Sequence, residues 1–143
     1  MGQEQTNRRL EELRERFKKE PLVRLLKAGL RDLNTRQAHV YVPANKELLI
    51  VDGIVQGGVI TAVADFAGVY VAMAQFPEGH TPCSNINIHF LKQIKEGEDI
   101  YAIATVVHMS RSSVLVEVSV SNSYELAAQA TMLFVKPRTE PKT

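Results

Sequence analysis

The chain has 143 residues, of which 45% are apolar, and it carries 17 lysine and arginine residues against 16 aspartate and glutamate residues. This length suits one domain that buries its own core without disulfides or metal clips. The near balance of charge excludes the basic excess typical of proteins that bind phosphate backbones, so we expect no nucleic acid partner. Cys83 is the single cysteine and cannot form an internal disulfide, and the N-terminus is polar and charged, which together favour the cytoplasm.

The first 29 residues predict two helices ahead of the main domain. Leu10, Leu13 and Phe17 recur at helical spacing among charged residues, which is typical of an amphipathic helix over the first twenty residues. Pro21 then starts a shorter helix, and Gly29 can end it because glycine tolerates left-handed backbone. We therefore expect a helical extension at 1–29 that packs outside a domain at 30–136, followed by a flexible tail at 137–143.

The main domain is predicted to combine one long apolar helix with strands. Residues 38–42 predict a first strand, and residues 43–55 a segment with turns. The apolar run at 57–74 approaches the length of a membrane span, but Asp65 lies near its middle, so we interpret it as a buried core helix and expect no membrane partner. Four more strands are expected at 83–91, 100–108, 113–120 and 126–135, with polar hairpin connectors at 110–112 and 122–124.

The arrangement of these elements predicts the fold class. Every second residue from Val114 to Val120 is a valine, as a half-buried antiparallel strand requires. The long helix is apolar on nearly all sides, whereas a surface helix would show a polar face. We therefore predict an α+β protein of the hotdog fold, in which a curved antiparallel sheet wraps around the central helix. Its open edge and remaining apolar face favour a homo-oligomer, a dimer or a tetramer.

The long helix also carries the features that point to chemistry. Asp65 is ionisable among apolar neighbours, and burial of its charge is costly unless it faces a wet cleft or takes part in a reaction. Gln56, Gly57 and Gly58 open the same helix, where free backbone N–H groups can hold a developing oxyanion. A structural interpretation stays open for both features, since Asp65 can face a water pocket or an interface and the glycine pair can be a plain turn.

These residues resemble a known family. Residues 53–65, read with Asn-Ile-His-Phe-Leu at 87–91, Gly97 and Ser-Arg-Ser at 110–112, resemble the PaaI-type branch of the hotdog acyl-CoA thioesterases, over residues 35–136. That branch carries a His-Gly-Gly motif with a catalytic acid nine residues after the histidine. Here Gln56 replaces the histidine and Asp65 lies nine residues further on, while Ile50 replaces a frequent asparagine.

The resemblance implies an activity and roles. The Gly57 N–H would polarise the thioester carbonyl, and Asp65 would act as nucleophile or as general base for water. The substrate would be an acyl-CoA, with no cofactor because coenzyme A is part of the substrate. Two functions remain open: an acyl-CoA thioesterase, or, given Gln56 and Ile50, a non-catalytic hotdog module that binds acyl-CoA or another acyl thioester.

Further residues are predicted to bind substrate. They include Phe66, Val69, Cys83, Ser84 and Asn85. The strand face that carries Asn85 either lines the acyl pocket or faces solvent, and both interpretations stay open. Arg111, with Ser112, can pair with the phosphates of coenzyme A, because guanidinium binds phosphate bidentately, although a solvated turn arginine remains the alternative. The four histidines lie on separate segments without ligand spacing, so no metal site is expected.

The site is predicted to be shared between two chains. Gly57 and Asp65 are eight residues apart, which separates them by roughly 12 Å along one helix. A carbonyl and the group that attacks it must lie within a few ångströms. Two antiparallel helices related by a two-fold axis would bring Gly57 of one chain opposite Asp65 of the other.

Overall fold

The computed structural model describes residues 1–137, so the tail predicted at 137–143 lies outside the described residues apart from Pro137. Two helices open the chain, α1 (Gln3–Lys19) and α2 (Pro21–Leu26), as predicted. The prediction that Gly29 ends the second helix is wrong. Lys27 ends it in the left-handed region, at φ 56°, where its N–H reaches the Arg24 carbonyl and the Ala28 N–H reaches the Val23 carbonyl. The last carbonyls of α2 are therefore satisfied before glycine is reached.

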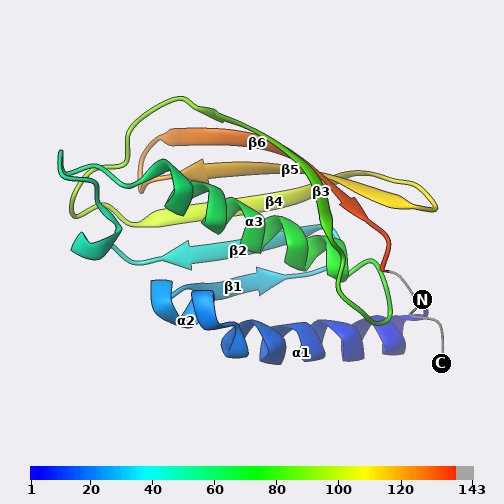
Figure 1. Cartoon of the computed structure of the whole chain (residues 1–143). Helices are drawn as coiled ribbons and strands as arrows, with labels where there is room; N and C mark the ends of the chain where they lie inside the picture. Colours follow the sequence, from blue (N-terminus) through cyan, green and yellow to red (C-terminus); the bar gives the residue numbers. More distant parts are fainter. Residues whose placement is uncertain (138–143) are drawn as a thin grey trace, which may run out of the picture.

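Gly29 instead begins a strand that the sequence did not predict. Within residues 1–137 six strands form one antiparallel sheet in the order β1-β2-β4-β5-β6-β3 (Figure 1). They are β1 (Gly29–Leu33), β2 (Gln37–Val42), β3 (Cys83–Phe90), β4 (Ile100–Met109), β5 (Ser113–Ser121) and β6 (Leu126–Val135). The connectors at 110–112 and 122–124 join β4 to β5 and β5 to β6, which confirms both predicted hairpins.

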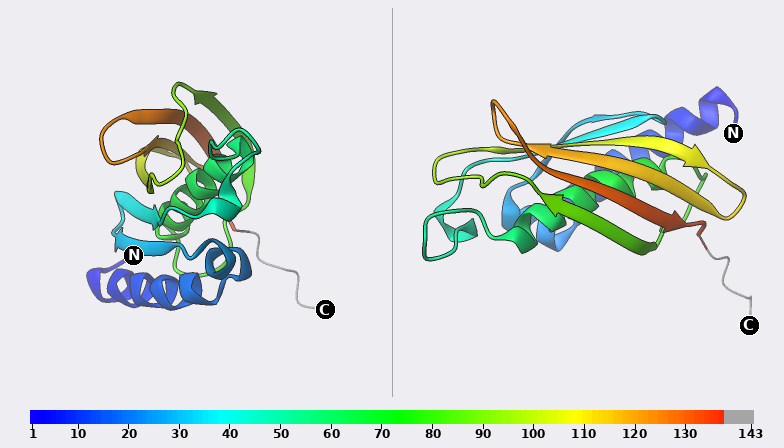
Figure 2. Two further views of the ribbon diagram at one scale, coloured as in Figure 1. Left: turned by 90° about the vertical axis from the view of Figure 1, so that its left-hand side faces the viewer. Right: turned by 90° about the horizontal axis from the view of Figure 1, so that it is seen from above.

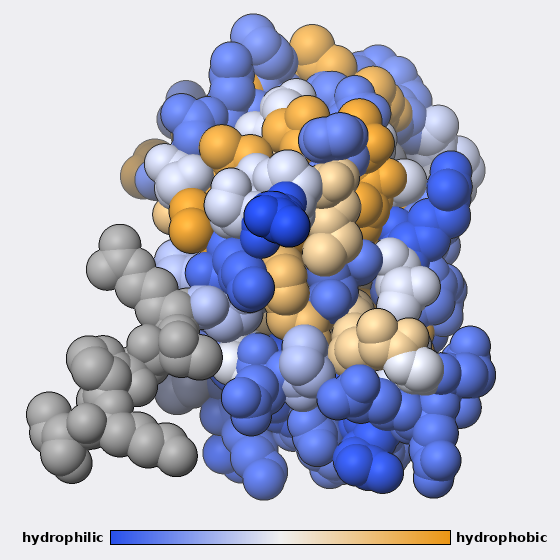
Figure 3. All heavy atoms as spheres, turned by 90° about the vertical axis from the view of Figure 1, so that its right-hand side faces the viewer, coloured by the Kyte–Doolittle hydropathy of each residue, from blue (hydrophilic) through white to orange (hydrophobic). Residues whose placement is uncertain are grey.

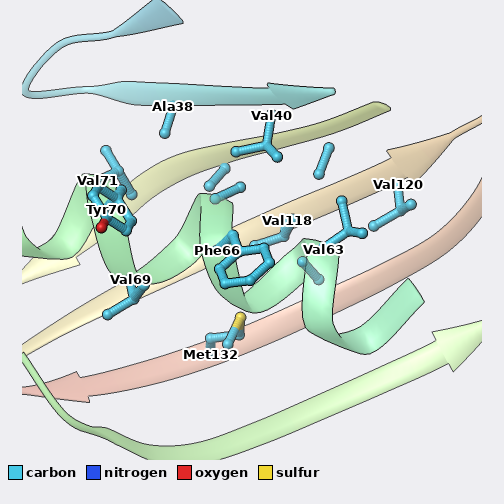
Figure 4. Packing of buried hydrophobic residues seen from close by; sticks show 14 of the residues in the cluster. Ala38, Val40, Val63, Phe66, Val69, Tyr70, Val71, Val118, Val120 and Met132 are labelled. Atoms are coloured by element: carbon cyan, nitrogen blue, oxygen red, sulfur yellow. The ribbon is translucent and has the colours of Figure 1, made fainter. Parts of the chain in front are cut away.

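The sheet curves around α3 (Gly57–Met73), as the left panel of Figure 2 shows, which confirms the hotdog fold. Side chains from β2, β5 and β6 converge on this helix in Figure 4, among them Val40, Val118 and Met132. Gly68 permits a close approach of the helix to β6, since a Cβ there would lie 3.0 Å from both the Met132 sulfur and the Phe134 ring. No helix in the described part of the chain is long and apolar enough to cross a membrane.

The turn-bearing segment between β2 and α3 holds a single short helical turn, η1 (Lys46–Leu48). Asn45 starts it, because its side-chain oxygen accepts a hydrogen bond from the Glu47 N–H at 3.0 Å. This segment delivers the chain to Gln56, where α3 begins.

The helix α1 packs against α3 as well as against the first strand. Its residues Leu13 and Phe17 are buried, and the Phe17 ring meets Tyr70 edge to face at a centroid distance of 5.0 Å. Arg9 is buried too, and its guanidinium donates to the carbonyls of Met73 at 3.2 Å and Gly79 at 2.7 Å. Hydrophilic residues cover the outer side of α1, in the lower part of Figure 3, while apolar residues gather above it over the sheet.

The strand β3 forms one edge of the sheet and is poorly covered. Seven of its eight residues are exposed, including Ile86 and Phe90. It pairs with β6 on one side only, so its other side presents unpaired backbone groups.

Candidate active site

Asp65 is half-buried in the middle of α3 and lines a cavity of about 180 Å³. The helix places Asp65, Phe66, Val69, Tyr70 and Met73 on one face because these positions are separated by about one turn each. Two distant segments complete the wall. Arg16 and Glu20 come from α1 and its junction with α2, and His80 and Cys83 come from the segment that leads into β3.

The surroundings of Asp65 raise its pKa. Burial is the main cause, and the charge of His80 offsets part of the effect. Among the described residues, no hydrogen bond or ion pair satisfies this carboxylate. A carboxylate that is partly desolvated and unpartnered is a stronger base than one in water, and it is available to a molecule that enters the cavity.

Cys83 lies close enough to Asp65 for the two groups to interact. Burial raises the pKa of the Cys83 thiol, and the charge of Asp65 raises it further. The Cys83 Sγ donates a hydrogen bond to the Asn85 carbonyl at 3.4 Å. The hydrogen bond with the Asn85 backbone lowers the pKa, but burial and the Asp65 charge outweigh it and favour the protonated thiol, so Cys83 lines the cavity without the thiolate character that a nucleophile needs.

The glycine pair lies apart from this cavity, about two helical turns before Asp65 along α3. Gln56 caps the helix, and its side-chain oxygen accepts a hydrogen bond from the Gly57 N–H at 3.0 Å. The Gly58 N–H has no partner within residues 1–137. A Cβ at Gly57 would lie 3.5 Å from the Phe90 ring, so the glycines adjoin the end of β3 that is remote from Cys83. One chain therefore does not bring Gly57 and Asp65 together.

Four predicted residues lie outside the cavity of the single chain. Ser84 is exposed on β3 and donates to the Leu133 carbonyl at 3.3 Å, and its neighbour Asn85 is exposed as well. Arg111 and Ser112 occupy the exposed tip of the β4–β5 hairpin. Their predicted contacts with substrate remain predictions.

The cavity also contains residues that the sequence did not single out. Arg16 and Glu20 belong to a segment in which charged residues are common, and His80 is one of four scattered histidines. Within residues 1–137, no group of three or more histidine, cysteine or acidic side chains is arranged to hold a metal ion.

Comparison with known proteins identifies the family of the chain. Residues 52–126 match the family model described as the thioesterase superfamily, and the chain belongs to that superfamily. No curated protein sequence matches the chain.

Solved structures confirm the fold. A thioesterase from Haemophilus influenzae matches with a TM-score of 0.78 and 20% identity, over 90% of each chain. A phenylacetic acid degradation-related protein from Ralstonia eutropha matches with a TM-score of 0.76 and 22% identity, over 82% of this chain and 91% of that one. A mutant of the phenylacetic acid degradation protein PaaI from Thermus thermophilus matches with a TM-score of 0.74 and 23% identity, over 82% of this chain and 99% of that one. These structures confirm the hotdog fold, and the family model confirms the resemblance to the hotdog thioesterase superfamily.

Proposed function

We propose that the chain is an acyl-CoA thioesterase, which hydrolyses a thioester to a free acid and coenzyme A without a metal or redox cofactor. The observation that carries the proposal is Asp65, a half-buried carboxylate with a raised pKa that opens, unpartnered among the described residues, into a cavity of a thioesterase-superfamily chain. Asp65 would attack the thioester carbonyl directly or remove a proton from the water that does. The cytoplasm, where thiols stay reduced, would be the site of the reaction.

The first turn of α3 would stabilise the oxyanion that forms on the carbonyl. The N–H groups of Gly57 and Gly58 lie at the positive end of the helix dipole, and neither residue carries a side chain that would block a substrate. The Gly58 N–H is free of partners within residues 1–137, whereas the Gly57 N–H must first exchange the Gln56 oxygen for the substrate oxygen. Arg111 and Ser112 would meet the phosphates of coenzyme A.

Each active site would be shared between two copies of the chain. The separation of Gly57 from the Asp65 cavity supports this proposal, as does the exposed edge of β3. The end of β3 at Cys83 adjoins the Asp65 cavity and the end at Phe90 adjoins Gly57. Antiparallel pairing of two β3 edges about a two-fold axis would therefore place the glycines of one chain beside the acid of the other.

A panel of acyl-CoAs tests the activity. We expect the purified chain to release free coenzyme A, measured with a thiol reagent, and the Asp65→Asn variant to release at least about a hundredfold less per unit time, which is the scale of a lost acid-base group. Release of coenzyme A at the same rate by a folded Asp65→Asn protein would overturn the assignment.

A mixing experiment tests the shared site. Asp65→Asn protein is combined with Gly57→Pro protein, which lacks the N–H, under conditions where subunits exchange. A mixed dimer holds one site with both defects and one with neither, so activity should return. Confirmed exchange with no recovery would refute sharing.

One observation favours a second function, a non-catalytic module that binds acyl-CoA or another acyl thioester. The Gln56 side-chain oxygen accepts a hydrogen bond from the Gly57 N–H, the group that the reaction would need as a donor to the substrate oxygen. Such a module would bind acyl-CoA, measured by calorimetry, and would release no coenzyme A in the same panel.

A further inference from the structure

The cavity beside Asp65 has a polar end that thioester hydrolysis does not require. Arg16 donates through Nε to the Oε1 oxygen of Glu20 at 3.2 Å, and the Tyr70 hydroxyl donates to the same oxygen at 3.0 Å. Tyr70 is only 1% exposed, and burial followed by the bond to Glu20 raises its pKa, so the phenol stays protonated. These three groups, the Arg16–Glu20–Tyr70 network, join the N-terminal helices to α3 in the wall of the cavity.

The network has hydrogen-bonding capacity left over. The second oxygen of Glu20 accepts no hydrogen bond within residues 1–137, and the five N–H donors of the Arg16 guanidinium exceed its contacts with Glu20 and Tyr70. Both side chains are partly open to solvent, at 41% for Arg16 and 32% for Glu20. A ligand in the cavity therefore finds a free acceptor oxygen on Glu20 and remaining N–H donors on Arg16 at this end.

The charges decide which ligand group fits. Arg16 and Glu20 carry opposite charges that cancel, and Asp65 adds a negative charge when it is ionised. Either ion would lose its hydration in this small and largely apolar cavity, and the opposite charges of Arg16 and Glu20 offset each other, so the network does not compensate that cost. A carboxylate would also be repelled by ionised Asp65. A neutral hydroxyl can donate to the free Glu20 oxygen and accept from an Arg16 nitrogen, so it satisfies both without repulsion.

The rest of the wall limits the size of the ligand. Phe66, Val69 and Met73 add apolar surface to the wall that holds Asp65 and the network. A volume of about 180 Å³ lies below the roughly 300–1,000 Å³ of pockets that hold drug-sized molecules. Phe17 packs behind Phe66 and Tyr70 and holds both rings in place.

We propose that the Arg16–Glu20–Tyr70 network recognises the far end of the acyl group, and that the substrate is a short acyl-CoA whose acyl chain ends in a neutral hydrogen-bonding group, most simply a hydroxyl. The inference rests on the proposed function, because it takes the cavity beside Asp65 as the acyl pocket. It makes the N-terminal helices a specificity-determining part of the site.

The test uses acyl-CoAs that differ only at the far end of the acyl chain. Butanoyl-CoA, 4-hydroxybutanoyl-CoA and succinyl-CoA form one such set of four carbons, and hexanoyl-CoA, 6-hydroxyhexanoyl-CoA and adipoyl-CoA form a set of six. We expect kcat/KM for the hydroxyl-ended compound to exceed that of the methyl-ended one about tenfold or more in at least one set, the scale of one hydrogen bond to a charged group. The carboxylate-ended compound should be the poorest.

Two variants separate recognition from structural support. In Glu20→Gln and in Tyr70→Phe, the ratio of hydroxyl-ended to methyl-ended kcat/KM should fall below about threefold. In Glu20→Gln, kcat/KM for the carboxylate-ended compound should also move closer to that for the methyl-ended compound. The control is Glu15→Gln on α1, since Glu15 lines a different cavity and pairs, among the described residues, with the exposed Lys18. This control should keep the wild-type ratio. Thermal unfolding of each variant shows whether it is folded.

Binding of thioether analogues, which cannot be hydrolysed, provides a readout independent of turnover. If no acyl-CoA is cleaved but the hydroxyl-ended analogue binds about tenfold more tightly than the methyl-ended analogue, the proposed function fails and the recognition site stands. The recognition site is overturned if wild-type protein shows no preference for the hydroxyl in either set, or if Glu20→Gln and Tyr70→Phe both keep it. A uniform loss over all three chain ends would also overturn it.

Discussion

Replacement of Phe17 by alanine tests whether α1 is an integral part of the domain. The ring is 2% exposed and lies edge to face against Tyr70 and Phe66, at centroid distances of 5.0 and 6.0 Å. Truncation of a buried phenylalanine costs about 3–5 kcal/mol, because its transfer free energy is lost and a cavity remains. At about 2–4 °C per kcal/mol for a chain near this length, the Tm should fall by about 6–20 °C.

Denaturant unfolding followed by circular dichroism measures the change, at one fixed protein concentration because an oligomer's stability depends on it. The matched control is Leu25→Ala on the neighbouring helix α2. Leu25 is 70% exposed, so its truncation should cost less than about 0.5 kcal/mol. If Phe17→Ala costs less than about 1 kcal/mol, α1 contributes little to the fold and the packing argument is wrong.

Three further predictions concern the candidate site. Asp65→Asn should be more stable than wild type at neutral pH, since burial raises the pKa of Asp65 and its charge destabilises the folded state. That cost is absent at pH values below the pKa of Asp65 in the unfolded chain, and it grows as the pH rises through the pKa of Asp65 in the folded protein. The melting curves of the two proteins should therefore converge in acid. A variant that is less stable than wild type at neutral pH would contradict this prediction. Gln56→His should keep or raise turnover, and a collapse of turnover with intact binding would reveal a dedicated role for glutamine. Alkylation of Cys83 at neutral pH should be faster in Asp65→Asn, because the aspartate charge helps to raise the thiol pKa; equal rates would argue against their proximity.

The long helix and the last strands could be predicted because the spacing of their apolar residues indicates both the length of each element and which of its faces is buried. The valines at alternate positions from Val114 to Val120 are all fully buried, as predicted. The strand β6 has the predicted bounds, and α3 ends one residue early. By contrast β1 could not be predicted, since Leu-Arg-Asp-Leu lacks β-branched residues and the strand depends on its pairing with β2.

Only part of the candidate site could be predicted from the sequence. Asp65 could be found because it is a single ionisable residue among apolar neighbours in the sequence. Arg16 and Glu20 could not, because α1 is charged along its length and only its docking on α3 decides which charges face the cavity. Arg9 is buried at 6% exposure although nothing in the sequence distinguishes it from Arg8.

The hydrogen bonds of Arg9 set an order of events during synthesis. Their acceptors, the carbonyls of Met73 and Gly79, come 64 and 70 residues later in the chain. At about 5–20 residues per second, α1 is made roughly 3–14 s before they exist. An isolated helix of this length is marginal in water, so α1 must dock late, after α3 has formed. The wall of the cavity is then completed last by a segment that is made before the other residues of the wall.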